Sequence, residues 1–214
     1  MDRIDTESKE RQKVVDPWQN QENTVKEIKN RHQPVDYTQV VADNRVLFLG
    51  ENHRNHSIRR HLVQHARELK KAGITHYAIE ANEGGNTIFE KLNRGESVDL
   101  SQVDVGPGRT DYEDAIRALA ALGIKVVAID IDQRSRPSRE EREARLTENI
   151  NRILQENPNS RVAVLIGDSH TLRHHVSEGV PSVGKRLMEA QVPIVNIYFT
   201  GGKSLIPKLI TSAV

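Results

Sequence analysis

The chain has 214 residues, 29% of them charged and 4% aromatic, with a mean hydropathy of −0.62, which fits one water-soluble domain or one domain with a tail. Its 31 basic and 30 acidic residues are well mixed, without a long basic run or interleaved aromatic residues, so we expect no nucleic acid partner. No apolar run approaches the ~18 residues that span a bilayer, and the absence of cysteine excludes disulfides, thiolate nucleophiles and cysteine–zinc sites.

The N-terminal segment is polar and charged, without clear helical or strand periodicity. We expect a flexible tail over residues 1–23 and a single α/β domain over residues 24–214. Met1–Gln33 lacks the apolar core of a secretory signal peptide, so export through the Sec system is not expected. The expected location is the cytoplasm, or a host cell reached through a specialised secretion system, and the sequence leaves the oligomeric state open.

Apolar periodicity, with glycines that end several segments, predicts the elements of the first half of the chain. In chain order they are short helices at Val25–Arg31 and Asp36–Ala42, a strand at Val46–Leu49, a helix through Ile58 and Leu69 that ends at Gly73, a strand at His76–Ile79, a short helix at Thr87–Leu92 and a polar loop at Arg94–Arg109.

The second half continues this alternation, and a capping box at Thr110–Glu113 is expected to open its first helix. The expected elements are a helix from Thr110 through Leu122, a strand at Ile124–Ile129, a helix at Ser138–Glu156, a strand at Val162–Ile166, a helix at Pro181–Ala190 and a strand at Pro193–Phe199. Strands that are apolar throughout and alternate with helices predict an α/β fold, with a largely parallel sheet and helices on both faces.

Ligands of such folds bind beyond the carboxyl ends of the strands. The acidic residues at these ends are Glu51, Glu80, Asp130 and Asp168. Because the carboxyl ends of parallel strands meet at one edge of the sheet, we expect these four carboxylates to lie along that edge.

Two Gly-x-x-His turns follow buried strands, one ending at His53 and the other at His170. A glycine permits a tight turn there, and a neutral imidazole serves as general base or metal ligand near neutral pH. A pair of histidines on solvated loops is the alternative. The repetition of the turn after two strands, each time with an acid inside it, favours a functional site, and Glu51 is placed to orient the His53 ring or bind a metal with it.

Three further residues are candidates for the same site. Glu80 closes its strand after a run of uncharged residues, and a carboxylate there is costly to bury unless it is paired or liganded. Arg142 and Asn149 are seven residues apart and share a helix face. A guanidinium on that face would stabilise an oxyanion or clamp Glu80, whereas the alternative is one more charge on a solvated face.

Two other patterns are not assigned to the site. His61 and His65 have the i, i+4 spacing of a zinc pair, but the glutamate of a His-Glu-x-x-His motif is absent, so both are expected on the surface. Gly201-Gly202-Lys203-Ser204 lacks the first glycine of a phosphate-binding loop and is rejected as one.

The motifs resemble those of the ChaN-like haem-uptake proteins of the Tiki/TraB superfamily and of the erythromycin esterases. The matching stretches are Leu47-Phe-Leu-Gly-Glu-Asn-His53 with His56 and His61, Glu80 after its strand, the helix from Arg142 to Asn149, Val164-Leu-Ile-Gly-Asp-Ser-His170 and Gly179-Val-Pro181. The resemblance covers roughly residues 45–187, implies an EreA/ChaN-like fold, and makes Arg142 a site residue.

The functions of this superfamily diverge. Erythromycin esterases hydrolyse a lactone with a histidine base, Tiki proteins are metal-dependent proteases, ChaN-like proteins bind haem, and related domains occur in bacterial toxins and effectors. We expect the chain to depart from each branch: from the haem-uptake proteins by lacking a lipoprotein leader, from the esterases by lacking room for an inserted helical lid, and from the Tiki and TraB proteins by lacking a transmembrane anchor.

The leading hypothesis is a hydrolase of a small-molecule or peptide substrate, acting as a bacterial effector or as a cytoplasmic enzyme. The expected roles are His53 as general base or metal ligand, Glu51 and Glu80 as its carboxylate partners, His170 as second ligand or base, Arg142 as oxyanion donor, and Asn149 and Asp168 as substrate contacts. A divalent metal, if used, would bind His53, Glu80 and His170. The alternative is a haem- or ligand-binding protein without catalysis, in which His53, His170 and Tyr77 or Tyr198 would hold iron.

Overall fold

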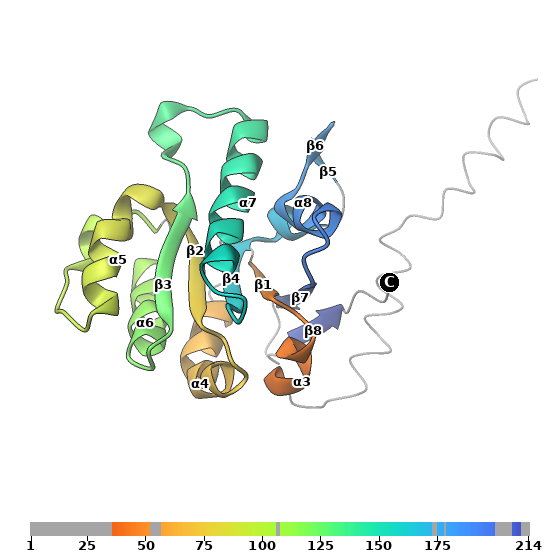
Figure 1. Cartoon of the computed structure of the whole chain (residues 1–214). Helices are drawn as coiled ribbons and strands as arrows, with labels where there is room; N and C mark the ends of the chain where they lie inside the picture. The colour runs from red at the N-terminus through yellow and green to blue at the C-terminus, as the bar shows by residue number, and fades with distance from the viewer. Residues whose placement is uncertain are drawn as a thin grey trace, which may run out of the picture. The chain divides into compact units, whose positions relative to one another are not determined.

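A computed structural model describes residues 36–51, 57–105, 108–172, 175–177, 179–199 and 207–210, all of which belong to one compact unit, residues 35–214. Its main sheet has the strand order β3-β2-β4-β1-β7-β8 (Figure 1). The strands are β1 (Val46–Glu51), β2 (His76–Asn82), β3 (Lys125–Asp130), β4 (Val162–Gly167), β7 (Ile194–Phe199) and β8 (Pro207–Ile210), and a separate small hairpin pairs β5 (His175–Ser177) with β6 (Val180–Pro181). The five strands from β3 to β7 are parallel, and β8 runs antiparallel to β7. The predicted α/β fold with a largely parallel sheet is therefore confirmed, whereas β8 was not predicted.

Helices flank the sheet on both faces, as the unbroken apolar strands require (Figure 1). The helices are α3 (Tyr37–Ala42), α4 (Ser57–Lys71), α5 (Asn86–Asn93), α6 (Arg109–Ala120), α7 (Arg139–Glu156) and α8 (Val183–Glu189), with short 3-10 helices η1 (Glu83–Gly85), η2 (Leu100–Gln102), η3 (Gln133–Ser135) and η4 (Asp168–Thr171). The predicted helix at Val25–Arg31 lies outside the described residues. No helix in the described part of the chain is both long and apolar enough to cross a bilayer.

Successive residues of the strands alternate between two apolar clusters. In β1, Leu47 and Leu49 belong to the cluster with α3 to α6, whereas Val46 and Phe48 belong to the cluster with α7 and α8. All four side chains are at most 1% exposed. This alternation decides on which side of the sheet each functional side chain lies.

The predicted capping box of α6 is wrong. The helix begins one residue earlier, at Arg109, after Gly108 in the left-handed region at φ 73°, and Glu113 lies 3.8 Å from the guanidinium of Arg109. The left-handed turn at Gly108 shifts Thr110 into the first turn of the helix, where it does not act as the cap. A capping box occurs instead at the start of α7, where Ser138 and Glu141 each bind the backbone of the other.

Two asparagines of α5 cover the free edge of β3. Asn86 donates to the carbonyl of Ala128 at 3.0 Å and accepts from its N–H at 2.8 Å. Asn93 does the same to Val126, at 2.9 and 2.8 Å. The two side chains satisfy backbone groups that another strand would otherwise pair with, which blocks this edge of the sheet.

Candidate functional site

The acidic residues at the strand ends divide between two groups at the carboxyl edge of the sheet. Glu51 follows the register of Leu47 and Leu49, and it contacts α4 and α6. Glu80 follows the register of Ala78, which packs with α7, and it contacts α7. The predicted edge thus carries two polar networks on opposite faces of the sheet.

The first network is centred on the guanidinium of Arg142. Its Nη2 lies 2.7 Å from Oδ2 of Asp130 and donates a short hydrogen bond to Oε1 of Glu80, while its Nε lies 3.0 Å from Oδ1 of Asp130. The other carboxylate oxygen of Glu80 accepts from the N–H of Gly167 at 2.7 Å. Burial lowers the pKa of Arg142, but the hydrogen bonds to Asp130 and the charge of Glu80 raise it by more, so the net pKa is raised. Arg142 therefore stays a cation that clamps two carboxylates.

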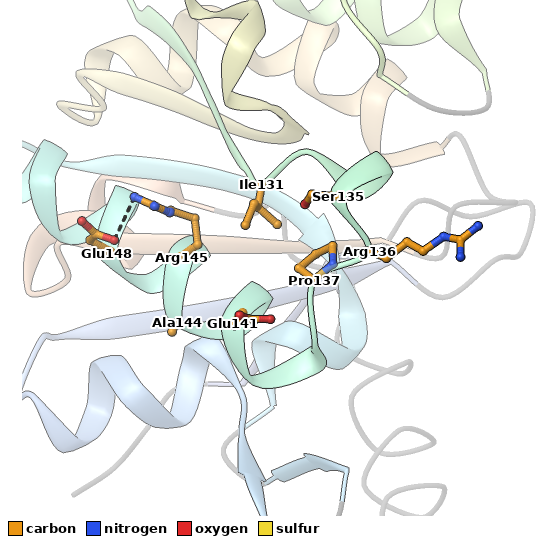
Figure 2. Close-up of a pocket in the computed structure, with 8 residues that line it drawn as sticks. All are labelled: Ile131, Ser135, Arg136, Pro137, Glu141, Ala144, Arg145 and Glu148. Atoms are coloured by element: carbon orange, nitrogen blue, oxygen red, sulfur yellow. Dashed lines mark ion pairs between the residues drawn. The ribbon is translucent and has the colours of Figure 1, made fainter.

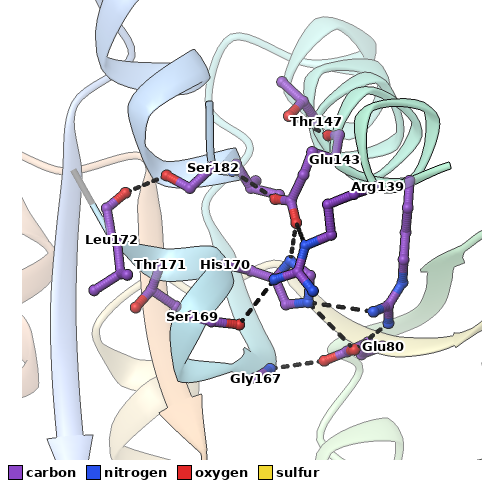
Figure 3. Close-up of polar contacts among 12 residues, drawn as sticks. Glu80, Arg139, Glu143, Thr147, Gly167, Ser169, His170, Thr171, Leu172 and Ser182 are labelled. Carbon is purple, nitrogen blue, oxygen red and sulfur yellow. Dashed lines mark hydrogen bonds and ion pairs between the residues drawn. The ribbon is translucent and has the colours of Figure 1, made fainter. Parts of the chain in front are cut away.

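His170, in η4 after β4, lies between carboxylates from two elements (Figure 3). Its Nδ1 is 2.6 Å from Oε1 of Glu143 on α7, and its Nε2 is 3.6 Å from Oε1 of Glu80. Nη1 of Arg142 points at the same Nε2 from 3.4 Å. Because a guanidinium only donates, Nε2 is the ring nitrogen that accepts from Arg142, and Nδ1 is the one that faces Glu143.

Glu143 itself is fully buried, with a hydrogen bond at Oε2 and two ion-pair contacts, but no hydrogen bond of regular geometry, at Oε1. Its Oε2 accepts from the N–H of Val183, at the start of α8, at 3.0 Å. Its Oε1 lies 3.4 Å from Nε of Arg139, whose Nη2 reaches Ser169 at 3.5 Å (Figure 3). A carboxylate fixed in this way holds the imidazole of His170 in one orientation.

A cleft of about 300 Å³ opens beside this network. Glu80, Asp130, Arg142, Tyr112 and Ile131 are among the residues that line it. A larger and more open groove of about 600 Å³ shares Ile131 and continues along the outer face of α7 (Figure 2). Arg136, Glu141, Arg145 and Glu148 line that groove, so the combined surface suits a polar ligand.

The second network is buried, and one of its members, Tyr112, also lines the cleft. Arg59 on α4 donates two hydrogen bonds of 3.0 Å to the carboxylate of Glu51, and the Tyr112 hydroxyl donates a third at 2.6 Å. The guanidinium also lies 3.6 Å from the centre of the Tyr112 ring. Burial lowers the pKa of Arg59, but its hydrogen bond to Glu51 helps to raise the net pKa, whereas burial and then the charge of Glu51 raise the pKa of Tyr112. Glu51 is thus held as a carboxylate beside a cation.

The structure places the other predicted site residues as follows. His53 lies outside the described residues. Asn149 is buried, and its amide nitrogen donates to Ile129 O at 2.9 Å and to Glu83 at 3.0 Å, whereas Asp168 is exposed at the start of η4. The catalytic and substrate roles of these residues, and of Glu51, remain predictions.

His61 is not the surface residue that the sequence predicted, because it is only 4% exposed. Its Nε2 makes a short hydrogen bond with the hydroxyl of Tyr37, and its ring stacks on His65 with the centres 4.0 Å apart. Burial lowers the pKa of His61 to about 4, with a further lowering by His65 that Glu68 opposes. The pair docks α3 on α4, and no group of three or more metal-ligating side chains occurs among the described residues.

Sequence reasoning missed Arg59, Tyr112 and Glu143, although a signal was present for two of them. Glu143 lies three and seven residues before Leu146 and Ile150, hence on the inner face of α7. Arg59 precedes Leu62 by three residues and Ala66 by seven, which places it on the buried face of α4. A charged residue at a buried helical position indicates a buried partner.

No family model matches the sequence, and no curated protein matches it. Solved structures do match. The toxin effector domain RRSP of Vibrio vulnificus aligns with a TM-score of 0.57 and 18% identity, over 83% of this chain and 37% of that one. The type III effector HopBA1 gives 0.55 and 19%, over 81% and 88% of the two chains. ChaN of Campylobacter jejuni, a structure with cofacial haem, gives 0.52 and 12%, over 81% and 91%.

The chain has the fold of ChaN and of these toxin and effector domains. The EreA/ChaN-like fold that the motifs implied is confirmed at this level. The chain spans 37% of the length of the Vibrio structure. At sequence identities of 12–19%, these similarities establish a shared fold and not a shared activity.

Proposed function

We propose that the chain is a hydrolase whose reacting centre combines His170, Glu80 and Arg142. The observation that carries the proposal is the line of groups from Glu143 through the imidazole of His170 to Glu80 and Arg142, of which Glu80 and Arg142 line a cleft at the carboxyl edge of the sheet. Ligands of parallel α/β sheets bind at this edge. A base with an orienting carboxylate behind it and a cation in front of it is the set of groups that acyl hydrolysis requires.

Each group has a distinct task in this reaction. Nη1 of Arg142 turns from Nε2 of His170 to the substrate, and the freed Nε2 takes a proton from a water molecule. Glu143 stabilises the imidazolium that forms at 2.6 Å from its carboxylate. The guanidinium of Arg142 stabilises the oxyanion that develops as water adds to the carbonyl carbon. Glu80 and Asp130 hold that guanidinium in place. Esters, lactones and peptides all pass through such an oxyanion, so the proposal covers these three bond types, with His53 as a further base predicted by the sequence.

The polar lining of the cleft and groove supports a polar substrate that extends from Glu80 past Ile131 onto α7 (Figure 2). A resident divalent metal is not part of the proposal, because the centre of the described network is already the cation of Arg142. Haem binding has less support, since Tyr77, one of its candidate ligands, is fully buried and burial raises its pKa well above the ordinary value.

The test is hydrolysis by the purified chain of p-nitrophenyl butyrate, of an aliphatic lactone and of a mixed peptide library. We expect His170→Gln and Glu80→Gln to lower the rate on the responsive probe by about 10²- to 10⁴-fold. His65→Gln, a histidine exchange on a half-exposed position of α4, is the matched control and is expected to keep the full rate. A folded His170→Gln variant with the full rate, or no hydrolysis of any probe by the unmodified chain, would overturn the proposal.

We propose further that the enzyme acts as an effector inside a host cell, in line with the fold it shares with toxin and effector domains. Expression in eukaryotic cells is expected to reduce their growth, and Glu80→Gln is expected to relieve that effect at equal protein levels. Glu96→Gln, the same exchange at an exposed position that lines neither the cleft nor the groove, is the matched control. Equal toxicity of the unmodified chain and the Glu80→Gln variant would show that hydrolysis is not the cause.

A further inference from the structure

A second polar cavity lies at the opposite, amino edge of the sheet, away from the site above. It measures about 350 Å³ and is formed by the first residues of β2 and β3, the end of α4 and the residues that follow α7. None of its lining residues takes part in the network of Arg142 or in that of Glu51. The cavity therefore needs a separate explanation.

The buried imidazole of His76 faces this cavity. The residue is 6% exposed and lines the cavity, yet its Nε2 has no hydrogen-bond partner. Its Nδ1 lies 2.8 Å from the hydroxyl oxygen of Thr75, which in turn donates to the carbonyl of Arg161 at 3.0 Å. We assign the hydroxyl hydrogen to the carbonyl of Arg161, so the hydroxyl oxygen accepts the proton of Nδ1. The neutral ring therefore carries a lone pair on Nε2.

The surroundings keep this ring neutral. Burial lowers the pKa of His76, the charge of Lys125 lowers it further, and Glu156 opposes them. Nε2 of His76 and Oε2 of Glu156 are 4.0 Å apart. A hydroxyl oxygen placed about 2.8 Å from both atoms would direct its single hydrogen at the two acceptors in a three-centre hydrogen bond. The cavity thus offers a pair of acceptors that one hydroxyl group can serve.

The rest of the lining supplies hydrogen-bond donors and positive charge. Lys70 reaches the cavity from α4, where its Nζ is held 3.1 Å from the carbonyl of Gly123, and Lys125 reaches it from β3. Thr75, Gly123, Asn157, Asn159 and Ser160 also line the cavity. With Glu156, the lining carries a net charge of +1, which favours an anion.

We propose that this cavity binds hydrogen phosphate, with the lysines on its oxygens and its P–OH shared between His76 and Glu156. The buried acceptor Nε2 of His76 favours an anion that carries a hydroxyl group. An anion without a hydroxyl group would leave Nε2 without a hydrogen bond, and its oxygen atoms would be repelled by the carboxylate of Glu156. Inorganic phosphate has a P–OH group at neutral pH, whereas sulfate has none. The site is therefore expected to discriminate between two anions of nearly equal size.

Isothermal titration of the purified full chain at pH 7 with sodium phosphate and with sodium sulfate tests this. The Kd of phosphate is expected to be at least about tenfold lower than that of sulfate, because one hydrogen bond that involves a charged group changes an affinity by at least this factor. Methyl phosphate separates an inorganic from an esterified source. Its monoanion keeps a P–OH below its second pKa of about 6 and its dianion does not, so a phosphomonoester ligand would bind at pH 5.5 and not at pH 8.

Glu156→Gln replaces an acceptor by an amide that also donates, so it is expected to weaken phosphate and strengthen sulfate. His76→Phe is expected to weaken phosphate alone, and Lys125→Met to weaken both anions alike. Glu148→Gln, the same exchange two turns earlier on α7, is expected to leave both affinities unchanged. Equal affinities for phosphate and sulfate, no binding of either, or a Glu156→Gln variant that keeps the preference while its thermal unfolding is unchanged would each overturn the assignment.

Discussion

Replacing Arg59 by methionine is expected to lower the free energy of unfolding by about 3–5 kcal/mol, which is the cost of leaving one partner of a buried ion pair alone. Glu51 and Arg59 have no exposed side-chain surface. Glu51 would keep the hydrogen bond from Tyr112 but would lose both hydrogen bonds from Arg59 and the only positive charge among these three side chains. Chemical denaturation followed by circular dichroism measures the loss.

Two comparisons make this prediction specific. Arg60→Met removes the same charge from the next, exposed position of α4 and is expected to change stability by no more than about 0.5 kcal/mol. The double variant Glu51→Gln, Arg59→Met removes both charges and is expected to be more stable than Arg59→Met alone. If Arg59→Met and Arg60→Met unfold at the same denaturant concentration, the pair does not stabilise the fold as the geometry indicates.

Most of the sheet could be predicted from the sequence because the signals are local. The five parallel strands are largely apolar runs, three of which end at a glycine or an acid (β1, β3 and β4), and the burial of these runs favours strands of a covered parallel sheet. β8 was not predicted because it has only four residues, starts at a proline and lies at the edge of the sheet. A short edge strand has no pattern of its own, since it needs to match its neighbour on one side only.

The site could be predicted less completely, because its partners meet only through tertiary packing. The sequence places Glu51 and Glu80 at the same sheet edge, and this is correct. The sequence near each glutamate does not show which helix contacts it, because the partners are distant in the sequence. Tyr112 lies 61 residues from Glu51, and Arg142 lies 62 residues from Glu80. Alternation along the strands was available from the sequence, and it separates the two glutamates onto opposite faces.

A methyl group at Gly184 is expected to disturb the site from outside it. A Cβ atom on this residue of α8 would lie 2.6 Å from the carbonyl oxygens of both Thr171 and Leu172. Hydrogen bonds hold both oxygens in place. Asn196 donates to the carbonyl of Thr171 at 2.8 Å, and the Ser182 hydroxyl donates a short hydrogen bond to the carbonyl of Leu172. α8 and η4 must then separate, which moves His170 relative to Glu143.

Gly184→Ala is therefore expected to lower the free energy of unfolding by about 1–3 kcal/mol, which is the usual effect of overpacking. It is also expected to lower hydrolysis by about 100-fold, because a displacement near 1 Å is enough to spoil a catalytic geometry. Gly84→Ala is the matched control, since a Cβ there meets only the side chain of Asn82 at 3.2 Å. The imidazole C–H resonances of His170 give a readout that does not depend on the proposed reaction, and they should shift in Gly184→Ala alone. Unchanged resonances and an unchanged rate in that variant would mean that α8 does not position the histidine.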